Sequence, residues 1–197
     1  MANILTEALP TKIQTESGIF EPVTDFRASI EFEIMVEKGE KDLFKLLRPY
    51  YPKGLQREQI EGAAAAALRL YQCGREEKKD TPKSSTKAKR VYSFEIDAPS
   101  IYADFLRYYN IDLSNTNLHW WKFRELLAGL PTDSAFKERI YYRTCELKGL
   151  PKKEQKRIAA IRKEIEIKTA EKGEKLTLAE RNKQMLDYVS KRSKETG

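Results

Sequence analysis

The chain has 197 residues, of which 40% are hydrophobic and 10% aromatic, and this apolar content is enough for one buried core. No apolar run reaches the roughly eighteen residues that a membrane span requires. With 37 Lys and Arg against 30 Asp and Glu, the net charge is +7, and the first ten residues lack the basic cluster of a signal peptide. The only cysteines, Cys73 and Cys145, are far apart in the chain, so we exclude a disulfide framework and expect a reducing cytosol.

The first third of the chain predicts a hairpin followed by capped helices. Short extended segments within residues 12–21 flank a turn with a glycine, which favours a β-hairpin. Thr24 and Asp25 can cap a helix at 26–39, where apolar residues recur at helical spacing. Five consecutive alanines, 63–67, indicate a helix that packs closely against a neighbour. The elements expected between these are a short helix at 42–48, a turn at 49–54 and the alanine-rich helix itself at 56–73.

The middle of the chain begins with a polar segment at 74–90. It contains no apolar residue larger than alanine, so we expect a mobile loop there. Residues 91–96 alternate like a strand but equally fit the start of a helix. Three helices are then expected, from Pro99 to Tyr109, from about 117 to 130, and from a cap at Asp133 to about 147.

Charge and aromatic residues divide the chain near residue 150. Residues 151–197 hold 14 Lys and Arg against 8 Asp and Glu, whereas 19 of the 20 aromatic residues precede them. We therefore predict a body at 1–150 and a basic extension at 151–197, in which Thr177 and Glu180 form a capping box for a last helix. The predicted fold is mainly α: a compact helical bundle with a short N-terminal β-hairpin and a basic C-terminal helical extension.

Residues that could carry chemistry are scarce. His119 is the only histidine, and neither cysteine has a metal-ligand neighbour at useful spacing. The glycine-rich phosphate-binding patterns are absent from the sequence, and paired carboxylates two positions apart fall on different sides of a helix. We therefore expect a binding protein and not an enzyme, with no catalytic, cofactor or metal residues.

The tryptophan pair in residues 118–124 allows two interpretations. Trp120 falls on one apolar arc of a helix, whereas Trp121 and Leu118 point into an arc shared with charged residues. In the first interpretation the helix is buried on two sides and His119 donates a hydrogen bond to a backbone carbonyl. In the second, Trp121 is a partly exposed anchor for a partner protein, with Leu118 beside it.

The basic extension also allows two interpretations. Its Lys and Arg residues could neutralise phosphates of a nucleic acid. Glutamates are interspersed among them, however, and Ile158, Ile161 and Ile165 form a narrow apolar stripe at helical spacing. We favour a protein contact through this stripe over nucleic-acid binding, and the candidate protein-binding residues are therefore these three isoleucines with Trp121 and Leu118.

Several segments together resemble a known family, and the match covers about residues 1–150. The most specific segment is Leu118–Phe123, which reads Leu-His-Trp-Trp-Lys-Phe. The other segments are Leu9–Pro10, Thr24–Arg27, Leu70–Gly74, Tyr92–Asp97, Ile101–Phe105, Tyr109–Leu113, Gly129–Pro131 and Tyr142–Arg143. Together they resemble the "gp-fifteen" family of siphophages and prophages of Gram-positive bacteria. One departure is the alanine run at 63–67, where bulkier residues are expected.

The resemblance implies a phage tail assembly chaperone that coats the tape measure protein in the host bacterial cytoplasm. It brings no catalytic or ligand residues. Other partners that it suggests are the major tail protein, a second tail chaperone, or further copies of the chain. The alternatives are a structural component of the tail or of head completion, and a helical protein associated with nucleic acid.

Overall fold

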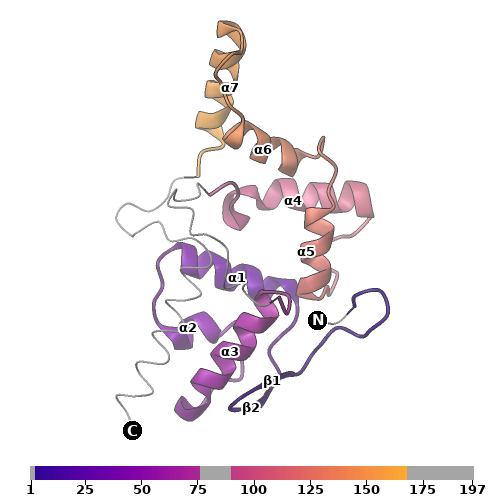
Figure 1. Cartoon of the computed structure of the whole chain (residues 1–197), viewed down its shortest axis with the longest axis vertical. Helices are drawn as coiled ribbons and strands as arrows, with labels where there is room; N and C mark the ends of the chain where they lie inside the picture. Colours follow the sequence, from indigo (N-terminus) through magenta and orange to yellow (C-terminus); the bar gives the residue numbers. More distant parts are fainter. Residues whose placement is uncertain (1–2, 76–89, 168–197) are drawn as a thin grey trace. The chain divides into compact units, whose positions relative to one another are not determined.

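Helices form most of the regular structure in the computed structural model, which describes residues 3–75 and 90–167 (Figure 1). These residues form two compact units, one comprising 3–75 with 118–124 and the other 90–117 with 125–167. The predicted mainly helical class and N-terminal hairpin are confirmed. The loop expected at 74–90 and the last helix of the extension lie largely or wholly outside the described residues.

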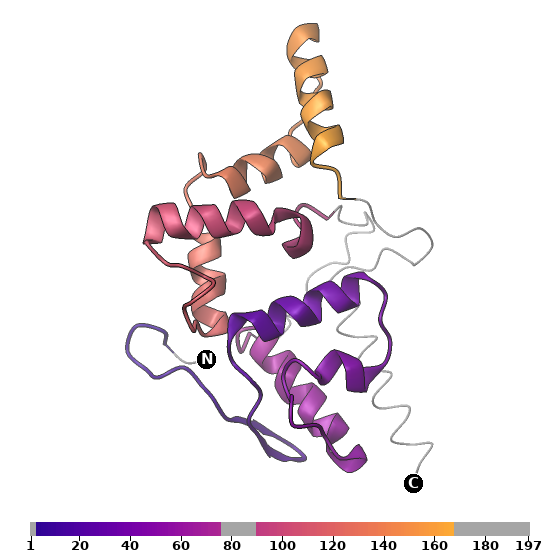
Figure 2. The same cartoon turned by 180° about the vertical axis from the view of Figure 1, so that it is seen from behind.

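The first unit combines the hairpin with three helices and the start of a fourth (Figure 2). In the hairpin, Ile13 pairs with Phe20 and Thr15 with Gly18 in antiparallel register. The elements are β1 (Ile13–Thr15), β2 (Gly18–Phe20), α1 (Phe26–Glu37), α2 (Leu43–Leu47), a 3-10 turn (Arg57–Gln59), α3 (Ile60–Tyr71) and the first turn of α5 (Trp120–Ala128). Both strands and α2 pack on α3.

Small residues on α3 explain this close packing. The side chains of Ala63, Ala64, Ala66 and Ala67 are at most 1% exposed. Gly62 faces the hairpin so closely that an added Cβ would lie 2.3 Å from the ring of Phe20. Any larger residue there would require the Phe20 ring to move, so the predicted close contact of the alanine-rich helix is confirmed.

Aromatic rings form the core of the first unit. Phe26 stacks on Phe123 with ring centroids 4.7 Å apart, and Trp120 stacks on Tyr71 at 5.6 Å. Offset and edge contacts of this kind add to the free energy gained by burial. A chain of contacting rings runs through Phe26, Phe123, Trp120, Tyr71, Phe32 and Tyr50.

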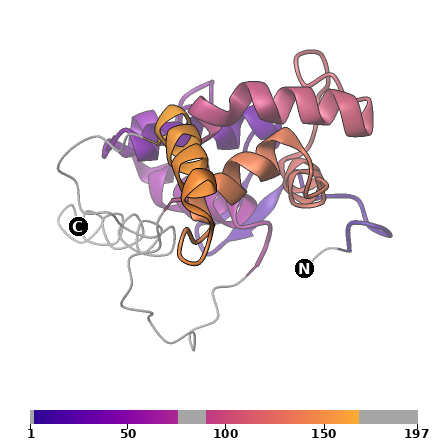
Figure 3. The same ribbon diagram turned by 90° about the horizontal axis from the view of Figure 1, so that it is seen from above.

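The second unit is helical throughout its regular structure. Its helices are α4 (Phe94–Tyr109), the end of α5, α6 (Ala135–Thr144) and α7 (Lys152–Glu164). α6 packs on α4 and on α7, which runs upwards from α6 in Figure 1 and is tilted in the view from above in Figure 3. The boundary predicted at residue 150 thus falls inside this unit.

Two predicted helix starts are wrong, and the choice left open for residues 91–96 is decided. α4 begins at Phe94, where the Asp97 carboxylate accepts the Ser93 N–H at 3.0 Å, so the helical interpretation of residues 91–96 is confirmed. α6 is capped by Ser134, not Asp133, and it ends at Thr144, before residue 147. α5 begins at Trp120, not 117, because the preceding residues pair with the segment before α1.

Candidate protein-binding surfaces

The segment just before α5 attaches a distant part of the chain to the N-terminal unit. The Phe26 N–H donates to the Leu118 carbonyl at 2.9 Å, and the Trp120 N–H donates to the Thr24 carbonyl at 2.8 Å. The Leu118 N–H also donates to the carboxylate of Asp25, which caps α1. Leu118 itself is only half-buried. The tryptophan pair is therefore fixed by backbone bonds before its side chains are considered.

Both indole rings belong to the core of the first unit. Trp120 is 0% exposed, and its Nε1–H donates to the Tyr71 carbonyl at 2.9 Å. Trp121 is 6% exposed, and its Nε1–H donates to the Leu70 carbonyl at 2.8 Å. The expectation that Trp121 is a partly exposed anchor is therefore wrong, because the end of α3 and Gly74 cover the second arc of the helix.

The remaining exposed edge of Trp121 borders a pocket of about 240 Å³. Arg69 crosses towards the hairpin and donates to the Gln14 carbonyl at 3.3 Å, while Lys12 pairs with Glu21 at 2.7 Å. The pocket is lined by Pro10, Lys12, Ile13, Gln14, Arg69, Gly74 and Trp121. A protein contact at Trp121 stays a prediction, and it could involve only this edge.

His119 has a defined tautomer. The Trp121 N–H points to Nδ1 at 3.1 Å, so Nδ1 must carry the lone pair and the ring proton lies on Nε2. Nε2 can then donate to the Pro10 carbonyl, 3.2 Å away. Burial lowers the pKa of His119 below its ordinary 6.5. The hydrogen bond to the Pro10 carbonyl raises this pKa in part, and the positive charge of Lys122 lowers it further. The interpretation in which His119 donates to a backbone carbonyl is the one that this geometry supports.

Lowering the pH from about 7.5 to about 5.5 should therefore destabilise the first unit. The unfolded chain takes up a proton at His119 near its ordinary pKa, whereas the folded chain takes it up only at lower pH. The unfolded state then binds more protons, and the free energy of unfolding falls as the pH falls. Urea unfolding followed by tryptophan fluorescence measures this loss. His119→Gln, which cannot titrate, should show a flatter profile, and equal slopes for both proteins would contradict the prediction.

The isoleucine stripe of α7 packs within the second unit. Ile158 is 2% exposed and Ile165 6%, while Ile161 is half-buried. Arg162, on the same helix, donates to the carbonyls of Tyr142 and Cys145. Its guanidinium therefore caps the C-terminal end of α6. The expectation that this stripe is open to a partner is wrong for Ile158 and Ile165, and for Ile161 it stays a prediction.

The opposite side of α7 is basic. Glu154 is engaged there with Arg157 at 3.2 Å. The exposed cations are Lys152, Lys153, Lys156, Arg157 and Lys163. The predicted mixture of charges on one helix thus separates into a buried apolar side and a mostly cationic exposed side.

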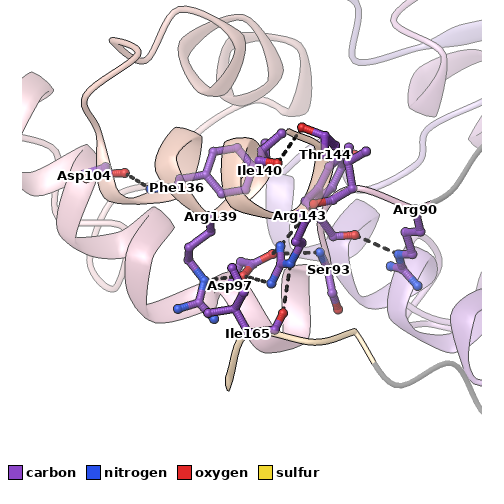
Figure 4. Close-up of polar contacts among 12 residues, drawn as sticks. Arg90, Ser93, Asp97, Asp104, Phe136, Arg139, Ile140, Arg143, Thr144 and Ile165 are labelled. Atoms are coloured by element: carbon purple, nitrogen blue, oxygen red, sulfur yellow. Dashed lines mark hydrogen bonds and ion pairs between the residues drawn. The ribbon is translucent and has the colours of Figure 1, made fainter. Parts of the chain in front are cut away.

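An ion cluster missed at the sequence level holds the second unit together (Figure 4). Asp97 is 0% exposed and accepts two bonds from Arg143, at 2.6 and 2.8 Å, and one from Arg139 at 2.7 Å. Arg143 also donates to the Ile165 and Val91 carbonyls. Burial by itself would raise the pKa of Asp97, but the bonds from Arg143, the Ser93 N–H and Arg139 lower it below its usual value. The cluster is structural, since every oxygen of the carboxylate is engaged.

The predicted protein-binding residues lie in different units. Trp121 and Leu118 belong to the first unit, and the three isoleucines belong to the second. Asp97 and Arg143 both lie in segments that carry the family resemblance, but neither residue type at its position indicates a buried pair. Within residues 3–75 and 90–167, side chains of His, Cys, Asp and Glu nowhere gather in threes as a metal site requires. In the same ranges, every helix is too short or too polar to cross a bilayer.

Comparison with known proteins gives one match. The model of the family described as Bacteriophage Gp15 protein matches residues 5–167, which include nearly all the described residues of both units. Neither curated proteins nor solved structures give a match to this chain.

Proposed function

Because the chain belongs to the Bacteriophage Gp15 protein family, which indicates a phage structural or morphogenesis protein, we propose that it is a tail assembly chaperone that binds the tape measure protein. The family match is the observation that carries the proposal. The chaperone acts in the host cytoplasm by binding and not by catalysis. The major tail protein, a second tail chaperone and further copies of the chain are the additional partners that we propose.

The character of the surface supports a binding role. A holdase needs apolar side chains that stay in contact with solvent until its client arrives. Both units present such side chains. The large exposed ones are Ile4, Leu5, Ile19, Val23 and Phe44 in the first unit and Ile96, Tyr102, Leu106 and Tyr141 in the second. The histidine and the buried Asp97, in contrast, are occupied by structural bonds.

Co-expression with the tape measure protein of the same phage tests the proposal. We expect the tape measure protein to stay soluble and to co-purify with the chain, because apolar segments of the client would be covered. We also expect purified virions to lack the chain, since a chaperone leaves as the tail polymerises. Stoichiometric presence in virions would favour a structural component. A complex with duplex DNA at physiological salt, without tape measure binding, would favour nucleic-acid association.

A further inference from the structure

A second pocket in the first unit lies between α2 and the turn that follows it. Its volume is about 180 Å³. An apolar cavity of about 150 Å³ is large enough to hold a benzene ring. The pocket, called the α2 pocket below, is lined mainly by Phe44, Leu47, Arg48, Tyr51, Pro52 and Leu55. It can therefore accept one aromatic or leucine side chain.

The floor of the α2 pocket is fixed, whereas its edge is exposed. Leu47 is 0% exposed, and the Tyr51 hydroxyl donates to the Ala63 carbonyl on α3 at 3.2 Å. Phe44, in contrast, is 47% exposed although its neighbours Leu43 and Leu46 on α2 are buried. An exposed aromatic ring beside a preformed apolar floor is the arrangement typical of an anchor site.

The charge around the α2 pocket favours an acidic partner. Arg48 lines the pocket and is exposed, and Lys53 lies between two lining residues. Neither forms an ion pair with another residue in the described part of the chain. The carboxylates just before α2 are already engaged. Asp42 caps the helix through the Phe44 N–H, and Glu40 accepts two backbone N–H groups and pairs with Lys45 at 3.5 Å.

We propose that the α2 pocket binds a helical segment of the tape measure protein through one apolar side chain, with an acidic residue one helical turn away paired with Arg48. This inference rests on the proposed function and adds to it the site and the chemistry of the bound segment. Residues three or four apart lie on the same face of a helix, so one segment can present both groups together. The cationic edge excludes a basic segment, and the small volume admits only one anchoring side chain.

Two substitutions in the full-length chain test the α2 pocket. Phe44→Ser removes the exposed ring, and Arg48→Glu reverses the charge at the edge. Each should lower the affinity for the co-expressed tape measure protein by about tenfold or more, because anchoring residues dominate binding energy. Both side chains are exposed, so the melting curve should not change. The matched control is Lys152→Glu, which reverses the charge of an exposed cation on α7.

The outcomes separate this inference from the proposed function. If the wild-type chain fails to bind the tape measure protein, the proposed function is wrong, and the α2 pocket does not bind a segment of that protein either. If wild type binds and both pocket variants bind equally well, the function stands and the α2 pocket is not the site. Restored binding of Arg48→Glu to a tape measure segment whose acidic residue is changed to lysine would support the pairing. Loss of duplex DNA binding alone in Arg48→Glu would overturn it in favour of a nucleic-acid contact.

Discussion

Replacing Asp97 with alanine should destabilise the second unit by about 3–5 kcal/mol, the usual cost of breaking a buried ion pair. Asp97 is fully buried, and its carboxylate is the partner of both Arg139 and Arg143. Without it, the Arg143 guanidinium, itself 7% exposed, keeps its backbone carbonyls but loses its counter-charge. Circular dichroism during urea unfolding measures the effect. Tryptophan fluorescence should change much less, since both tryptophans lie in the first unit.

A matched surface pair provides the control. Lys12 and Glu21 are joined at 2.7 Å, as closely as Asp97 and Arg139, but their side chains are 65% and 63% exposed. Glu21→Ala should therefore cost only about 0–1 kcal/mol. Equal losses for Asp97→Ala and Glu21→Ala would show that burial does not decide the strength of the cluster.

Removing either tryptophan should destabilise the first unit by about 3–5 kcal/mol, the range for a buried Trp or Phe changed to alanine. Trp120→Ala would break the chain of contacting rings between Tyr71 and Phe123. Trp121→Ala would leave a cavity beside Gly74 and remove the indole N–H that donates to the Leu70 carbonyl. Thermal unfolding of the two variants measures both losses.

Phe44→Ala is the control for these two variants. It also removes an aromatic ring from the first unit, but that ring is 47% exposed, so its stability should stay within about 0.5 kcal/mol of wild type. A Trp121→Ala variant that melts like Phe44→Ala would contradict the assignment of Trp121 to the core. It would also restore the interpretation of Trp121 as an exposed anchor.

Local signals in the sequence were sufficient for the first third of the fold. Asp25 and Asp42 cap α1 and α2 through side-chain bonds two residues along the chain, so adjacent residues determine where these helices begin. The alanine run likewise indicates close packing because its small volume is a property of the residues themselves. Features of this kind could be predicted from the sequence alone.

Features that depend on distant residues could not be predicted in this way. Helical periodicity separates Trp120 and Trp121 into two arcs, but it does not show that the end of α3, some fifty residues earlier, covers the second arc. Arg143 pairs with Asp97 across 46 positions, and that bond links α4 to α6. A lone Asp and a lone Arg on amphipathic helices are ordinary in sequence, so neither indicates a buried pair.

The first unit is discontinuous in the chain, and this has a consequence for its synthesis. Its core needs Trp120 and Phe123, which follow Tyr71 by about fifty positions, and the Leu118–Asp25 bond spans 93. At roughly 5–20 residues/s, the ribosome takes about 2–10 s to make the chain between residues 75 and 124. During that interval Phe26 and Tyr71 are present without Phe123 and Trp120, the rings that stack on them. Folding of this unit on the ribosome must therefore await residues made after α4 of the second unit, and a nascent chain that stalls before residue 118 would expose the unfinished core to aggregation.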